Sequence, residues 1–306
     1  MRRTPAFPRP QAAWSAAALL LAVLLSSGCA PTPAALAPAA PAPQRAGPAP
    51  AAAIQAGPAA AGIQAGPAAA GPAPREVGTL FANPVSGRRE TVVADPARTA
   101  VLIGDSQSAG AAGVPQSGTW PVTALASLGY TVSFSGRGGT GFVAANPPVG
   151  NYPDALEQGN WHIPYGNVPL VVIEGGGNDA SRGATDVQIL ANAERLLTDL
   201  KTSYPASRIV MVGTLGRGSA AGANRRSDVD GLLGGFAARH GIPFIGAGDW
   251  ITRFGLANKM ADAVHLTPAG HRILRTVLAR RLQDLGVDGP APAGDTAVVV
   301  RSAAGS

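Results

Sequence analysis

The sequence predicts an α/β fold, a three-layer α/β/α sandwich around a central parallel sheet of about five strands. Short apolar runs alternate with segments of helical periodicity between residues 99 and 285, as in repeated βαβ units. The run at residues 170–173, Leu-Val-Val-Ile, is apolar at every position, which suits a strand covered by helices on both faces. Polar, glycine-rich stretches follow several of these runs, and the loops after parallel strands share one edge of a sheet.

The elements are expected in the following order. Strands are predicted at residues 99–104, 130–135, 170–173, 208–213 and 242–245. Helices are predicted at residues 119–128, 186–204, 225–240 and 268–285. Gly129 suits the end of the first helix, and Pro268 suits the start of the last. Residues 142–167 contain four prolines and are expected to be irregular.

The N-terminal residues differ in composition from this globular part, for which we expect residues 75–288. Residues 1–74 contain none of the 18 Asp and Glu and four of the 24 Lys and Arg, so much of the net charge of +6 lies there. No dense basic block occurs, so we expect no nucleic-acid partner. Residues 1–29 read as an export signal, with arginines ahead of an apolar run that is short for a membrane span.

The end of this signal, Ser26-Ser27-Gly28-Cys29, resembles a bacterial lipobox, although Ser26 stands where Leu is usual. The resemblance implies that Cys29 is lipidated and anchors the chain at the cell surface or envelope. Ordinary secretion, with cleavage after a small residue, is the alternative. Residues 30–74 are rich in Ala, Pro and Gly and predict a disordered linker, and residues 289–306 predict a disordered tail in which 297–300 could form a strand.

Four polar stretches fall in loops after predicted strands or before the last helix. They are Gly-Asp-Ser-Gln-Ser-Ala-Gly at 104–110, Gly-Arg-Gly-Gly-Thr-Gly at 136–141, Gly-Gly-Gly-Asn-Asp at 175–179, and the segment 262–271. Their residue types fit nucleophilic ester chemistry. Ser106 becomes a nucleophile when a base such as His265 takes its proton, and Asp262 is close enough in sequence to orient that base. Glycine-loop N–H groups and an Asn amide can stabilise an oxyanion.

These four blocks, in this order over residues 99–285, resemble the SGNH hydrolases, also called the GDSL esterase/lipase superfamily. The resemblance implies a flavodoxin-like fold, with Ser106 as the nucleophile and Asp262 and His265 as acid and base. It also implies an oxyanion hole formed by the N–H of Ser106, the N–H of Gly138 and the side chain of Asn178. Gly136 departs from the family pattern, which usually has Asn there.

Other candidate residues favour structural roles. We expect Asp105 to be a turn residue and His240 and His271 to be structural, whereas His162 could line the substrate cleft. We expect no metal and no other cofactor, because the chain has four His, one Cys and no His-x-x-x-His pair. The single cysteine also excludes an intramolecular disulfide.

We therefore expect a secreted or surface-anchored, monomeric serine esterase that acts on carboxylic esters, such as short acyl groups on cell-envelope glycans. Its membrane contact would be the N-terminal anchor only. Two alternatives stay open. An acyltransferase could use the same triad to pass the acyl group to a sugar hydroxyl, and a non-catalytic glycan-binding domain could use the same scaffold.

Overall fold

The computed structural model describes residues 75–221 and 224–290, which all belong to the second of two units of the chain, Ala69–Ser306. The expected export signal, Cys29, the linker and the strand considered at 297–300 lie outside the described residues. Among the helices described, none combines the length and apolar character needed to cross a membrane.

Five parallel strands form the central sheet, in the spatial order β4-β3-β6-β7-β8. Their bounds are β3 (Thr99–Gly104), β4 (Thr131–Gly136), β6 (Leu170–Glu174), β7 (Arg208–Val212) and β8 (Phe244–Ile245). Numbered along the chain, this order is 2-1-3-4-5, a doubly wound arrangement. The structure confirms the predicted fold class and the five strands.

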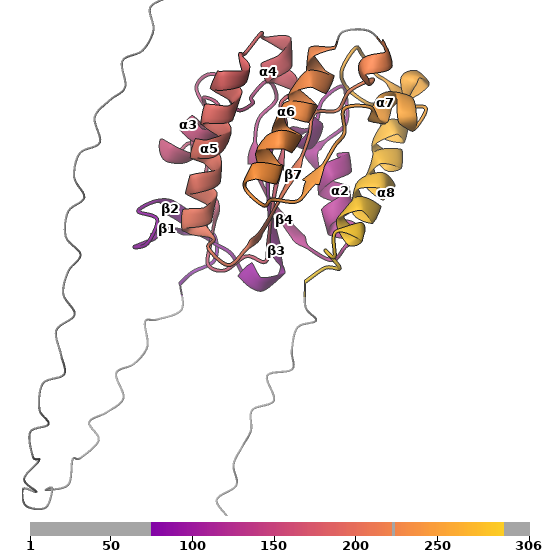
Figure 1. Ribbon diagram of the computed structural model, residues 1–306. Helices are drawn as coiled ribbons and strands as arrows, with labels where there is room; N and C mark the ends of the chain where they lie inside the picture. The colour runs from indigo at the N-terminus through magenta and orange to yellow at the C-terminus, as the bar shows by residue number, and fades with distance from the viewer. Residues whose placement is uncertain (1–74, 222–223, 291–306) are drawn as a thin grey trace, which may run out of the picture. The chain divides into compact units, whose positions relative to one another are not determined.

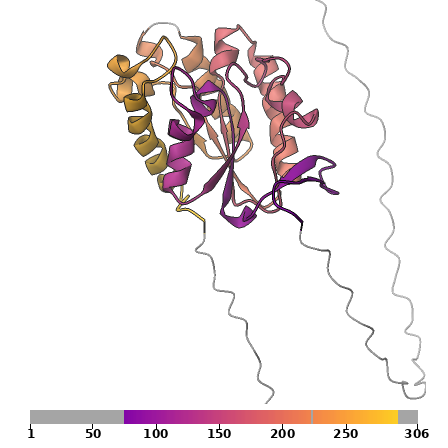
Figure 2. The ribbon, with the colours of Figure 1, turned by 180° about the vertical axis from the view of Figure 1, so that it is seen from behind.

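Helices cover both faces of the sheet (Figure 1, and from behind in Figure 2). One face packs against α3 (Tyr152–Glu157), α4 (Gly177–Ser181), α5 (Asp186–Ser203) and α6 (Arg225–Arg239). The other face packs against α2 (Trp120–Ser127), α7 (Trp250–Arg253) and α8 (Pro268–Asp284). Successive strand residues point to opposite faces, so Val101 and Ile103 enter one core while Ala100 and Leu102 enter the other.

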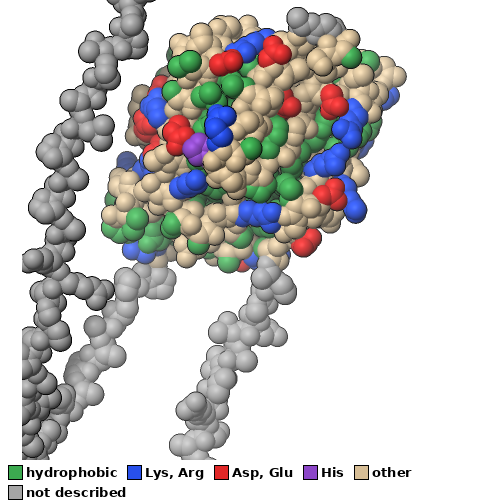
Figure 3. All heavy atoms as spheres, viewed as in Figure 1, with side chains coloured by type: hydrophobic (Ala, Val, Ile, Leu, Met, Phe, Trp, Pro, Cys, Tyr) green, Lys and Arg blue, Asp and Glu red, His purple; other side chains and the backbone are tan. Residues whose placement is uncertain are grey.

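The longer helices begin where the sequence signals predict. Thr185 and Gln188 form a capping box at the start of α5, and Thr267 accepts a hydrogen bond from Gly270 N ahead of α8. Lys and Arg side chains lie among Asp and Glu side chains on the face seen in Figure 3. Arg195 of α5, for example, bonds Asp154 and Glu157 of α3. Short 3₁₀ turns lie in the connections, as η1 (Pro96–Arg98), η2 (Gln116–Gly118), η3 (Ser219–Ala221) and η4 (Ala257–Lys259).

The expectation that residues 142–167 are irregular is wrong in part, because they contain α3 and a short strand. Pro153 occupies the first turn of α3, where the missing N–H costs nothing, and Asn151 caps that helix. Pro164 begins an edge strand, another position that tolerates proline. This strand belongs to a second, three-stranded sheet formed by β1 (Leu80–Ala82), β2 (Arg89–Val92) and β5 (Pro164–Tyr165).

Candidate active site

The predicted site residues meet at the carboxyl edge of the central sheet. Ser106 follows β3, Gly138 follows β4 and Asn178 follows β6, and β3 lies between β4 and β6. The strand order reverses between β3 and β6, and the crevice at such a switch point is where doubly wound sheets bind ligands.

Ser106 is the first residue of the short helix α1 (Ser106–Ala109), which Asp105 caps by accepting a hydrogen bond from Gln107 N at 2.9 Å. His265 lies in the loop before α8 and brings its Nε2 to 2.9 Å from Ser106 Oγ. The other ring nitrogen, Nδ1, lies 2.7 Å from Asp262 Oδ2. A continuous chain of hydrogen bonds therefore joins the Ser106 hydroxyl to the Asp262 carboxylate.

Asp262 is held in its ionised form although it is half-exposed. Its bond to the His265 ring and the N–H groups of Val264 and His265, each 2.8 Å from Oδ1, lower the pKa of Asp262 to about 2. An ionised carboxylate can only accept, so it selects the His265 tautomer that carries its proton on Nδ1. Nε2 is then free to accept the Ser106 hydroxyl proton.

Two backbone N–H groups, those of Ser106 itself and of Gly138, are available as hydrogen-bond donors. A Cβ placed on Gly138 would lie 3.5 Å from Ser106 Cβ, so this glycine brings its backbone close to Ser106. Asn146 fixes that segment by donating from Nδ2 to the Gly138 carbonyl at 2.6 Å. Within the described ranges, neither the Ser106 N–H nor the Gly138 N–H has a protein acceptor.

The third expected donor, the Asn178 amide, is already engaged. Its Nδ2 donates to Thr140 O at 2.9 Å and to Asp105 Oδ2 at 3.1 Å, which uses both of its hydrogens. Asn178 nevertheless lines the same hollow as Ser106. To donate to an oxyanion, Asn178 has to exchange one of these two bonds.

The hollow around Ser106 has a volume of about 360 Å³. Its lining includes Ser106, Gly138, Asn178 and His265, together with Asp105, Gln107, Gly110, Ala111, Gly139, Arg226 and Val264. Asp262 contacts this site through His265. All five residues predicted for the active site are thus brought together.

Sequence reasoning missed the residues that support the site. Gln107 donates to Val264 O at 2.8 Å and accepts from Trp120 Nε1 at 3.3 Å, so it joins α1 to the loop that carries His265. Nothing in the local sequence marks this role. Glu174 was detectable in principle, because it is an acid at the end of an otherwise apolar strand.

Glu174 and Asp105 form a buried acidic pair. Ser108 Oγ donates to Glu174 Oε2 at 2.8 Å. Burial, and then the nearby Asp105, raise the pKa of Glu174 well above its ordinary value. Burial likewise raises the pKa of Asp105 to about 6, against the opposing effect of the Gln107 N–H. Asp105 caps a helix, as a turn residue does, and also contacts the oxyanion-hole candidate Asn178.

The other histidines lie outside this hollow. His271 is buried and accepts from Trp120 N at 3.0 Å, and His240 ends α6 and pairs with Glu194. His162 lines a separate hollow beside β2 and α3, so the idea that it borders the cleft around Ser106 is wrong. Residues 75–221 and 224–290 contain no group of three or more His, Cys, Asp and Glu that could hold a metal ion.

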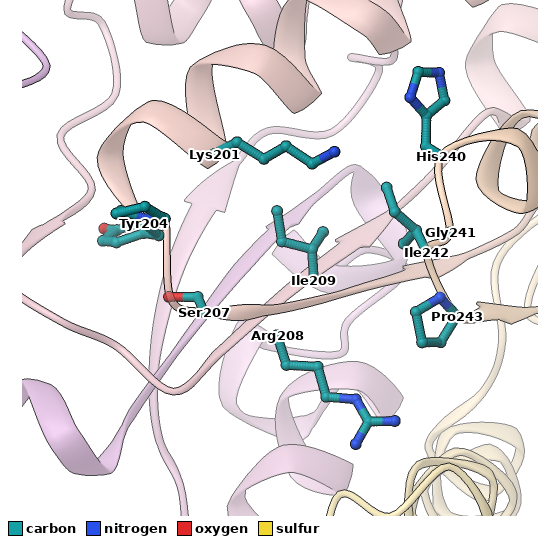
Figure 4. Close-up of a pocket in the computed structure, with 10 residues that line it drawn as sticks. Lys201, Tyr204, Ser207, Arg208, Ile209, His240, Gly241, Ile242 and Pro243 are labelled. Carbon is teal, nitrogen blue, oxygen red and sulfur yellow. The ribbon is translucent and has the colours of Figure 1, made fainter. Parts of the chain in front are cut away.

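A larger hollow of about 480 Å³ lies near the other end of the strands (Figure 4). Lys201 and Tyr204 at the end of α5, Arg208 at the start of β7 and His240 at the end of α6 surround it. Lys201 lies in the last turn of α5, where the C-terminal carbonyls of a helix favour a cation. This hollow lacks the residues of the Ser106 site.

Known proteins resemble this chain over the part that contains the five site residues. The sequence profile of the GDSL-like lipase/acylhydrolase family matches residues 102–273, which include Ser106, Gly138, Asn178, Asp262 and His265. No curated protein matches the chain.

Solved structures of carbohydrate esterases have a similar fold. They include an active-site mutant of a family two carbohydrate esterase from Clostridium thermocellum (16% identity, TM-score 0.51, 62% of this chain and 64% of that one). A second is a family two carbohydrate esterase from the same organism in complex with cellohexaose (17%, 0.50, 66% and 68%). A third is a family two carbohydrate esterase from Cellvibrio japonicus (15%, 0.50, 64% and 64%). This chain thus spans slightly under two thirds of the first and third, and the likeness shows the fold alone.

Proposed function

Because the chain belongs to the GDSL-like lipase/acylhydrolase family, whose members are carboxylic ester hydrolases, we propose that it is a serine esterase in which Ser106, His265 and Asp262 form the catalytic triad. The observation that carries this proposal is the hydrogen-bonded chain from Ser106 Oγ through the His265 ring to Asp262. The three residues have the contacts that the chemistry needs, with the base against the nucleophile and the carboxylate against the base.

The proposed reaction proceeds in two halves. Ser106 Oγ attacks the ester carbonyl while His265 Nε2 takes its proton, and Asp262 stabilises the imidazolium that forms. The N–H groups of Ser106 and Gly138, and the Asn178 amide, stabilise the oxyanion of the tetrahedral intermediate. His265 then protonates the leaving alcohol. Water attacks the acyl-enzyme with His265 again as base, which releases the acid and restores Ser106.

The proposed substrates are short acyl esters, including those on cell-envelope glycans. Glycine and alanine line the hollow beside Ser106 (Gly110, Ala111, Gly138, Gly139), and its moderate volume suits a small acyl group. The structures of similar fold include a carbohydrate esterase in complex with cellohexaose, which favours a sugar as the alcohol. Export and lipidation at Cys29 complete the proposal and rest on the leader sequence alone.

A fluorophosphonate probe tests the nucleophile. We expect it to label the folded wild type and the control variant Ser127→Ala, but not Ser106→Ala. Alongside it, esters graded by acyl length should be hydrolysed fastest at the short end. Equal labelling of wild type and Ser106→Ala would remove the serine-esterase proposal, and a wild type that takes no label would favour a binding domain.

Two further measurements separate the remaining alternatives. With a glycan acceptor present, an esterase releases the acyl group as free acid, whereas an acyltransferase transfers it to the sugar. For the anchor, the mass of the mature N-terminus decides. A lipid-modified Cys29 supports anchoring, and an unmodified chain that starts elsewhere contradicts it.

A further inference from the structure

Arg226, near the start of α6, is an arginine in the wall of the catalytic hollow. A Cβ placed on Gly177 would lie 2.5 Å from Arg226 Nη1, so the guanidinium lies directly against the backbone that precedes Asn178. Gly177 leaves the space that the guanidinium occupies. A positive charge is thereby placed beside one of the expected oxyanion donors.

This charge has no ion-pair partner among the described residues. Arg226 donates from Nη2 to Ser181 Oγ at 3.1 Å and from Nη1 to Leu215 O at 3.5 Å, whereas a guanidinium has five N–H donors. The preceding residue, Arg225, shows the usual alternative, because it pairs with Asp186 at 2.6 Å. Burial lowers the pKa of Arg226, and Asp105 and Glu174 act against that effect and favour its charged form.

A second arginine, Arg217, lines a neighbouring hollow. Arg226 and Val264 line both the catalytic hollow and an adjoining one of about 170 Å³, which Arg217 also lines. Arg217 likewise forms no ion pair within the part of the chain that the structure describes. Two arginines therefore line neighbouring hollows, of which the first contains Ser106.

The proposed reaction directs the alcohol side of the ester towards these two hollows. In the proposed reaction His265 protonates the leaving oxygen, so the alcohol portion lies on the His265 side of Ser106. Val264 is the neighbour of His265 and borders both hollows. An alcohol portion that extends past Val264 meets Arg226 first and then Arg217.

We propose that Arg226, assisted by Arg217, binds an anionic oxygen group on the alcohol portion, so that the preferred substrate is an ester of an acidic alcohol, such as an acylated sugar that carries a carboxylate or a phosphate. The planar guanidinium fork matches both groups, and its unused donors can form charge-assisted hydrogen bonds with them. This inference rests on the proposed esterase function and adds the chemical class of its substrate.

Matched ester pairs test it on the full-length mature protein. We would compare kcat/KM for 3-acetoxybenzoate and its neutral isostere 3-acetoxybenzamide, with 3-acetoxyphenyl phosphate to distinguish phosphate from carboxylate. We expect the wild type to prefer at least one anionic ester by about tenfold or more, which is the range of a charge-assisted hydrogen bond. Added salt should reduce the preference.

Arg226→Gln should remove most of that preference. The control Arg239→Gln removes the same net charge from the exposed C-terminal end of the same helix and should keep the preference. A preference that survives Arg226→Gln, or that Arg239→Gln reduces equally, overturns the proposal.

The wild-type comparison needs no variant, so it stands even if Arg226→Gln fails to fold. Equal kcat/KM for charged and neutral esters would overturn this inference and leave the esterase proposal intact. Failure to hydrolyse any of the esters would instead overturn the esterase function itself.

Discussion

Asp105 acts on the site through its neighbours and has no contact with the triad hydroxyl. It accepts hydrogen bonds from Gln107 N and from Asn178 Nδ2, one on each carboxylate oxygen. Asp105 thus links the nucleophile helix to the oxyanion-hole candidate. We assign it as a positioning residue.

We predict that Asp105→Asn lowers kcat for a short ester by about tenfold or more and leaves KM nearly unchanged. The two partners lie on different oxygens of Asp105, and an asparagine replaces one of these oxygens with an NH2 donor, so Asn178 loses its fixed orientation. Loss of a whole oxyanion donor costs about 10²–10³ in kcat, which sets the upper range. Steady-state kinetics at pH 7.5 measure the effect.

Asp230→Asn is the matched control. Burial raises the pKa of Asp230 to about 6 as well, but this residue accepts a hydrogen bond from Ala247 N and has no contact with Asn178.

A carboxyl whose pKa is raised in the folded state, such as Asp105 or Asp230, binds more protons in the folded than in the unfolded state. Stability therefore falls as pH rises from about 4 to 6. Both variants should weaken this slope, and a loss of kcat in Asp230→Asn equal to that in Asp105→Asn would contradict the assignment.

Among single residues, the sequence predicted those that belong to motifs. It missed those whose roles depend on contacts formed only in the fold. Ser106, Asp262 and His265 fall in a recognisable motif pattern, and all three meet in the structure. Gln107 and Arg226 are ordinary residue types in their local sequence, and their roles arise from contacts over long sequence separations, such as Gln107 with Val264.

Among the elements, the loop after β4 depends on one buried carboxylate in α4. Asp179 accepts from Phe142 N at 3.0 Å, Val143 N at 2.7 Å and Ala144 N at 2.8 Å. These bonds hold the segment that follows Gly138. The loop lacks a regular hydrogen-bond ladder there, so Asp179 supplies the acceptors.

We predict that Asp179→Ala lowers the free energy of unfolding by about 3 kcal/mol, because it leaves backbone donors without acceptors. It should also reduce kcat, since the Gly138 N–H loses its support. Chemical denaturation and ester kinetics test both effects. Asp186→Ala, which removes an exposed surface ion pair, should change stability by less than about 1 kcal/mol. Equal stability of the two variants would count against the role of Asp179.

The contact between α2 and α8 contains a buried histidine that cannot easily become charged. Burial, and to a lesser extent His265, lower the pKa of His271 from 6.5 to about 4. The unfolded chain takes up a proton on this side chain as pH falls below about 6.5, while the folded protein does so only near 4. Folding stability is therefore lost across that interval on acidification.

We predict that His271→Gln removes an acid-induced loss of about 3 kcal/mol between pH 6.5 and 4, the amount that corresponds to this pKa difference. The glutamine oxygen can replace Nδ1 as the acceptor for Trp120 N. Urea denaturation of both proteins at several pH values gives the difference curve. A difference that does not vary with pH would refute this account.

Elements of the central sheet were predictable because five apolar runs alternate with amphipathic helices. The small second sheet was not, since β1, β2 and β5 have two to four residues each and leave no clear periodicity. Its pairing of β2 with β5 joins segments about seventy residues apart. Local pattern carries no information about such a contact.

Across the described part of the molecule, the central sheet contributes side chains to two hydrophobic cores, one on each of its faces. Each inner strand sends alternate side chains to opposite faces, so damage to one core loosens strands on which the other core depends. Leu196 of α5 and Leu278 of α8 are fully buried in opposite cores. They offer a matched pair of substitutions.

We predict that Leu196→Ala and Leu278→Ala each lower the free energy of unfolding by about 2–5 kcal/mol, through lost burial and the cavity left behind. Both should shift the same single transition, because neither face can stay folded without the shared strands. Far-UV circular dichroism, tryptophan fluorescence and ester hydrolysis should give one midpoint for each variant. If Leu278→Ala produced an early fluorescence transition while the helix content stayed unchanged, the two helical layers would unfold independently, which would contradict this prediction. Ester hydrolysis would then be lost in the first of two steps, because the Ser106 site is built from strands and loops that both layers support.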